Sequence, residues 1–156
     1  MDKPDIIQSI IHNLKQDLLQ AQQAAEEAMK GATHEQSKAE TQYDTLGLEH
    51  AYLAEGQSRR IQDLTLEISK LENWQAPEFA MDDEIYLGAL INLISRTSDQ
   101  SLLVFIAPAG GAQKIEGINL QVITPDTPLA CALLGKGVDD QITLPNGLRF
   151  EITQLR

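Results

Sequence analysis

Two stretches of apolar residues with a seven-residue repeat dominate the first half of this 156-residue chain. In the first stretch the apolar residues alternate at intervals of four and three: Ile7, Ile11, Leu14, Leu18, Ala21, Ala25 and Ala28. The second stretch ends in Ile61, Leu64, Ile68 and Leu71. This spacing places a continuous apolar seam along one side of an α-helix, as in coiled coils. We therefore expect two long helices that fold back on each other as an antiparallel hairpin.

A helix stop and a helix start lie between the two repeats. Gly31 is a residue type that commonly ends helices. Thr33 and Gln36 have the spacing of a capping box, in which each side chain bonds the backbone of the other residue. The sequence thus predicts a first helix that ends at about residue 30, a tip at about residues 30–36 and a second helix over about residues 34–73.

Beyond Pro77 the apolar period changes from that of a helix to that of a strand. Alternating apolar residues predict a strand over 85–93, and Pro145-Asn-Gly147 predicts a hairpin turn. The other expected elements are strands at 101–106, 113–118, 119–123, 141–144 and 148–155, and one short helix over 128–134 that Gly135 closes.

The expected fold class is therefore α+β, with a helical part followed by a small, mostly antiparallel β domain. The coiled-coil hairpin would occupy residues 1–75, a linker residues 76–82, and the C-terminal domain residues 83–156. A capped turn favours a hairpin within one chain, so we expect a monomer.

The charge and the aromatic content of the chain disfavour two classes of function, nucleic-acid binding and catalysis in a pocket. The net charge is −11 and the sequence pI is about 4.5, which argues against binding nucleic acid through the chain's own phosphate contacts and fits a basic protein partner or simple solubility. Aromatic residues make up 4% of the chain, few for a pocket-bearing enzyme. We expect a cytoplasmic protein without a membrane segment. The single cysteine, Cys131, lies in an apolar run and is expected in the core.

Three segments resemble Gre-type transcription elongation factors. The first is Ile123-Thr-Pro-Asp-Thr-Pro-Leu-Ala-Cys-Ala-Leu-Leu-Gly-Lys-Gly-Val-Asp-Asp-Gln-Ile142, in which a Thr-Pro-Leu strand end is followed by a short helix, a Gly-Lys pair and an acidic turn. The second, Leu144 to Ile152, is similar to the family's closing hairpin. In the third, Tyr43, Tyr52-Leu53 and residues 57–61 lie where the family's second helix carries Tyr, Phe-Leu and Arg-Ile.

The resemblance implies an FKBP-like C-terminal domain that docks at the rim of the secondary channel of a bacterial RNA polymerase. The hairpin would enter the channel and bring acidic tip residues to the polymerase active site, close to the 3′ end of the nascent RNA. There they would help to hold the second Mg²⁺ and stimulate cleavage of backtracked transcripts. The protein would then be an accessory factor and not itself an enzyme. The expected docking residues are Pro128, Leu129, Leu134, Gly135 and Lys136.

The tip departs from the acidic motif of cleavage-active members. When Tyr43 is aligned with the family's tyrosine, Gln36 and Ala39 fall at the two positions where cleavage-active members have acidic residues. The acidic residues of this chain, Glu35 and Glu40, each lie one position away. We expect Glu35 and Glu40 to be the catalytic and Mg²⁺-binding residues. Glu35 could instead stabilise the N-terminus of the second helix.

Other functions stay open from sequence. The main alternative is a regulator that occupies the channel without stimulating cleavage. A structural coiled-coil dimerisation module is a further possibility. A prolyl isomerase is disfavoured, because that activity needs an aromatic-lined pocket and only Tyr86, Phe105 and Phe150 follow residue 80.

Overall fold

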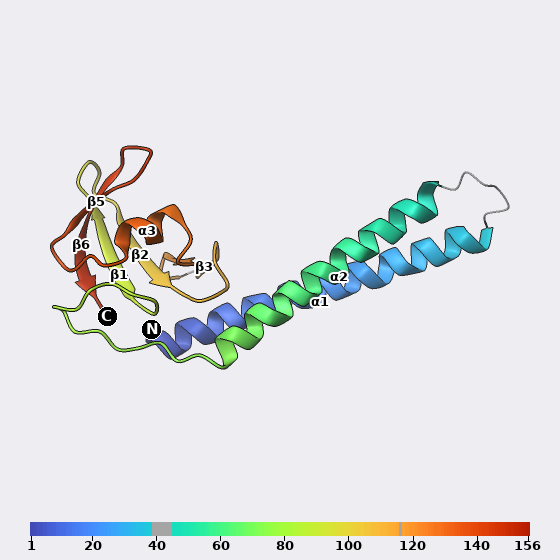
Figure 1. The fold of residues 1–156 in the computed structure, drawn as a ribbon, viewed down its shortest axis with the longest axis horizontal. Coiled ribbons are helices and arrows are strands. Elements are labelled where there is room, and N and C mark those ends of the chain that lie inside the picture. Colours follow the sequence, from blue (N-terminus) through green and yellow to red (C-terminus); the bar gives the residue numbers. More distant parts are fainter. Residues whose placement is uncertain (39–44, 116) are drawn as a thin grey trace. The chain divides into compact units, whose positions relative to one another are not determined.

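The computed structural model describes residues 1–38, 45–115 and 117–156; of residues 32–38, 45, 46 and 50 it describes only the backbone. A helical N-terminal region is followed by a mixed β-sheet with one short helix (Figure 1), so the predicted α+β class is confirmed. The chain divides into two compact units: the helical unit, His12–Ser69, and the C-terminal unit, which joins Met1–Ile11 to Lys70–Arg156.

Helix α1 spans Lys3–Lys38 and helix α2 spans Thr45–Glu72. In Figure 1 the two helices run in opposite directions. Most residues of the predicted seam are buried, which confirms the seam; the buried members are Ile7, Ile11, Leu14, Ala21, Ala28, Leu64, Ile68 and Leu71, together with Ala54.

The predicted turn around Gly31 is wrong. Helix α1 continues through Gly31 and Thr33 and ends at Lys38. A glycine inside a helix costs about 1 kcal/mol relative to alanine, and here the residues on both sides, mostly good helix formers, continue the helix through it. Thr33 and Gln36 therefore lie inside α1 and not at the start of α2. Helix α1 is the longer of the two described helices, at about 54 Å from 1.5 Å per residue.

The sheet has the strand order β3-β4-β2-β1-β6-β5. The strands are β1 (Leu90–Ser95), β2 (Ser101–Ile106), β3 (Lys114–Ile115), β4 (Leu120–Ile123), β5 (Gln141–Thr143) and β6 (Arg149–Leu155). Strands β2 and β4 are parallel, and the other described pairs are antiparallel. The expected antiparallel sheet is thus a mixed one, because the chain makes a crossover through β3 before it returns beside β2.

Strand β1 begins five residues later than predicted. Gly88 has a φ of +95°, and the amide of Ala89 donates to the carbonyl of Tyr86 over 3.1 Å. This turn ends the alternating pattern before Leu90, so residues 85–88 are outside the strand although their apolar spacing matches one.

Helix α3, Pro128–Leu133, packs on one face of the sheet. Its buried residues Ala130 and Leu133 belong to a core cluster with Ile91, Val104 and Ile152. Cys131 is exposed on the outer side of this six-residue helix, so its predicted place in the core is wrong. A short helix can bury only one side, and its neighbours in sequence already fill that side.

The opposite face of the sheet is covered by residues that follow α2. Successive residues of a strand point to opposite faces, so Phe105 lies on the other side from Val104. Its ring contacts Trp74 with a centroid distance of 6.1 Å and an interplanar angle of 49°. A Cβ placed on Gly88 would lie 2.4 Å from Cδ of Pro77 and 3.2 Å from the Trp74 ring. The glycine therefore lets the segment after α2 lie directly on the sheet.

Replacing Gly88 by alanine is expected to destabilise the protein strongly. A left-handed backbone costs a non-glycine residue about 1–2 kcal/mol, and the clash with Pro77 adds about 1–3 kcal/mol. Gly147→Ala is the matched control, because Gly147 has a φ of +84° and no atom within 4 Å of an added Cβ. Urea denaturation of both variants measures the difference, and equal losses would contradict the packing role of Gly88.

Candidate docking surface and helix tip

Helix α3 starts at a capped turn in the segment that resembles Gre-type factors. The amide of Ala130 donates to the Thr127 hydroxyl over 3.3 Å, and that hydroxyl donates to the carbonyl of Thr124 over 2.9 Å. Pro128 occupies the first turn of the helix, where a missing amide hydrogen costs nothing. The Thr-Pro pair thus fixes both the position and the direction of α3.

The Gly135-Lys136 pair that follows α3 is held by the segment before β1. The amide of Gly135 donates to the carbonyl of Ile85 over 2.9 Å, and the amide of Ile85 donates to the carbonyl of Lys136 over 2.7 Å. Gly135 has a φ of +78°, a conformation that favours glycine. The two reciprocal bonds give Lys136 a rigid backbone. Sequence reasoning placed Ile85 in a strand and missed this role.

The predicted docking residues differ in exposure. Pro128, Gly135 and Lys136 are exposed, whereas Leu129 and Leu134 are half-buried against the core. All five lie on α3 or directly after it. Among these five residues, a docking partner would therefore contact mainly Pro128, Gly135 and Lys136, which lie at the start of α3 and just after its end.

Asp126 lies beside this surface. The Thr124 hydroxyl donates to an Asp126 carboxylate oxygen over 2.5 Å, and this bond lowers the pKa of Asp126 below its usual value. The exposed Asp126 is therefore ionised at neutral pH, which places one negative charge near the N-terminus of α3.

The two predicted metal ligands lie at the end of α1 and beyond it. Glu35 is in the last turn of α1, and its side chain is outside the described residues, as is all of Glu40. The alternative role of Glu35, stabilisation of the N-terminus of the second helix, is excluded by this position. An acid in the last turn of a helix is disfavoured by about 0.3–1 kcal/mol, because the helix dipole is negative there.

The part of the chain that the structure describes contains no group of three or more His, Cys, Asp or Glu side chains that could hold a metal ion. Within the same residues, no helix is both long and apolar enough to span a membrane.

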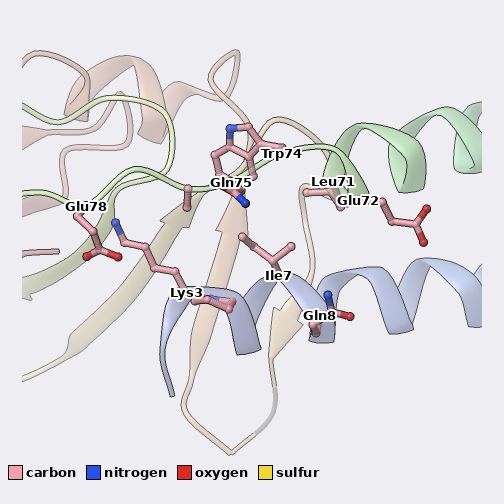
Figure 2. Close-up of a pocket in the computed structure, with 10 residues that line it drawn as sticks. Lys3, Ile7, Gln8, Leu71, Glu72, Trp74, Gln75 and Glu78 are labelled. Carbon is pink, nitrogen blue, oxygen red and sulfur yellow. The ribbon is translucent and has the colours of Figure 1, made fainter.

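A pocket of about 420 Å³ lies between the start of α1 and the segment after α2 (Figure 2). Lys3 is only 5% exposed, its ammonium donates to the carbonyl of Pro77, and it lies 4.7 Å from the centroid of the Phe79 ring. Burial lowers the pKa of Lys3, partly offset by Glu78, toward which the side chain points in Figure 2. The Lys3 ammonium thus makes its contacts with residues of the same fold. The sequence analysis did not predict this burial.

Comparison with known proteins gives matches among solved structures alone. No protein-family profile matches the chain, and no curated protein matches it. A structure titled transcription factor Gfh1 is 26% identical, with 94% of this chain and 92% of that chain covered and a TM-score of 0.41. GreA factor homolog 1 (Gfh1) of Thermus thermophilus is 22% identical, with 94% of each chain covered and a TM-score of 0.39.

A third similar structure is the prokaryotic elongation factor GreA/GreB from Nitrosomonas europaea, with 19% identity, 67% of this chain and 88% of that chain covered, and a TM-score of 0.36. These structures carry the names of the family that the sequence motifs resemble.

Removing the cap of α3 is expected to destabilise the C-terminal unit by about 1 kcal/mol in Thr127→Ala, because the amide of Ala130 loses its acceptor. Thr127→Ser keeps the hydroxyl and should be close to wild type. Urea denaturation distinguishes the two, and an equal loss in both variants would show that the methyl group matters rather than the cap.

Proposed function

We propose that the protein is a transcription factor that binds RNA polymerase. The surface at α3, formed by the exposed residues Pro128, Gly135 and Lys136, would dock on the rim of the secondary channel. The observation that carries the proposal is the arrangement of the segment that resembles Gre-type factors. Thr127 caps α3, Ile85 fixes the Gly-Lys pair, and Pro128 and Lys136 remain exposed at its two ends.

In this proposal α1 and α2 enter the channel, and the segment between them reaches the polymerase active site. Helix α1 is about 54 Å and α2 about 42 Å long at 1.5 Å per residue, which suits a long, narrow passage. The protein acts as an accessory factor and has no active site of its own.

Glu35 and Glu40 would supply carboxylate oxygens, which are the ligands that Mg²⁺ prefers. When bound, a second Mg²⁺ activates water and stabilises the leaving oxygen in the hydrolysis of a phosphodiester. The unfavourable place of Glu35 in the last turn of α1 supports a role outside the fold, since the helix gains nothing from an acid there. The remaining ligands would come from the polymerase.

The cleavage role can be tested on RNA polymerase halted in a backtracked complex with a labelled transcript and Mg²⁺. We expect faster release of short 3′ fragments with the wild-type protein. Glu35→Ala or Glu40→Ala should reduce this release by roughly tenfold or more, because loss of even a second-shell partner of a metal ligand typically costs about 10- to 100-fold. Glu27→Ala is the control, because Glu27 is an exposed acid of α1 two turns before Glu35.

The same assay separates the two forms of the proposal. If the wild-type protein releases no fragments but competes with a channel-binding cleavage factor, it is a regulator that occupies the channel. The displaced tip acids favour that outcome. If it neither stimulates cleavage nor competes, the assignment to RNA polymerase fails.

The docking surface makes a separate prediction. Lys136→Glu reverses an exposed charge in the proposed interface and is expected to weaken binding to core RNA polymerase roughly tenfold. Lys114→Glu makes the same charge change on β3, where the residue is also exposed. Titration of labelled protein with polymerase measures both. Equal affinities of the two variants would remove Lys136 from the interface.

A further inference from the structure

An exposed apolar patch lies on α2. It consists of Leu48, Tyr52 and Leu53, which are 54%, 64% and 58% exposed, and of the backbone of Gly56. Residues three and four apart share one side of a helix, so Tyr52, Leu53 and Gly56 form one continuous surface. A shallow groove lies over them, bordered by Glu49 and Gln57.

None of the described residues explains why position 56 is a glycine. Gly56 lies inside a regular helix, and an added Cβ would meet no atom within 4 Å. Glycine costs about 1 kcal/mol relative to alanine in such a position. The missing side chain leaves a notch beside two large apolar side chains, which is a shape suited to receive a protruding side chain of a partner.

The size of the patch indicates the kind of partner. An aromatic side chain buries about 150–250 Å² when fully covered, so three half-exposed apolar side chains offer on the order of 300 Å². A stable dimer needs roughly 800 Å² from each partner. The patch is therefore too small to hold a second copy of this chain, and fits one contact within a larger interface.

Charge favours a protein partner over RNA. The helical unit His12–Ser69 has ten acidic and five basic residues. Near the patch, Arg59 is already paired with Glu55 over 2.7 Å. Phosphates would meet mostly repulsion, whereas a protein wall with an apolar protrusion and basic surroundings would be complementary.

We propose that the patch of Leu48, Tyr52, Leu53 and Gly56 is a second contact with RNA polymerase, in which the Gly56 notch receives an apolar side chain of the polymerase. This inference rests on the proposed function. In this proposal the surface at α3 binds the C-terminal unit to the polymerase, and the patch binds α2 to the polymerase through a second contact.

Binding of core RNA polymerase to labelled variants tests the patch. We expect Leu53→Ser, Tyr52→Ser and Gly56→Leu each to weaken binding by roughly fivefold to thirtyfold, as for central interface residues. Leu66→Ser is the matched control, because Leu66 is on the same helix, is 61% exposed and lies outside the patch. Gly56→Leu should also raise thermal stability, so weaker binding by this variant cannot reflect unfolding.

The outcomes separate this inference from the function on which it rests. If the wild-type protein does not bind polymerase, both fail. If the wild-type protein binds and the patch variants bind like Leu66→Ser, only the patch contact is overturned. A loss confined to complexes that contain RNA would overturn it in favour of an RNA contact. Concentration-dependent sedimentation that the patch variants abolish would overturn it in favour of a dimer.

Discussion

The contact of Pro77 and Trp74 with the sheet is the constraint on which the C-terminal unit depends. It exists because Gly88 has no side chain, so that Pro77 can approach within a distance that a Cβ would forbid. With the segment in place, Trp74 covers Phe105, and the carbonyl of Pro77 accepts the hydrogen bond of the buried Lys3 ammonium. One glycine thus allows the second face of the sheet to be covered, and the covering segment in turn holds the start of α1.

In the same unit, α3 combines a backbone held at both ends with residues that are exposed to solvent. Helix α3 is fixed at its start by Thr127 and after its end by the two bonds to Ile85, whereas Pro128, Gly135 and Lys136 face outward. Exposed residues on fixed backbone lose little conformational freedom when a partner binds. This is the physical reason why the short helix suits a docking surface, even though it contributes only one side to the core.

Glycine has opposite roles in the two units. Gly88 is required by packing within the fold, since a neighbouring proline fills the space of its side chain. Gly56 lies in open space, where a side chain would fit and would favour the helix. The first glycine is explained by the structure of the chain alone. The second is not explained by packing among the described residues, and in our proposal a side chain of RNA polymerase occupies the space.

The sequence by itself determined the helical seam, the α3 segment and the hairpin turn at Pro145-Asn-Gly147, because these depend on local spacing and on residues with strong backbone preferences. It did not determine every end of a helix or strand, although the predicted strand 101–106 matches β2. Gly31 is a typical stop, yet α1 continues to Lys38. Ile85 has the spacing of a strand, yet the turn at Gly88 separates it from β1. Only tertiary structure decides such ends, because the energy of continuing an element competes with contacts to residues distant in sequence. The exposure of Cys131 and the burial of Lys3 were decided in the same way, by which side of each helix the rest of the fold covers.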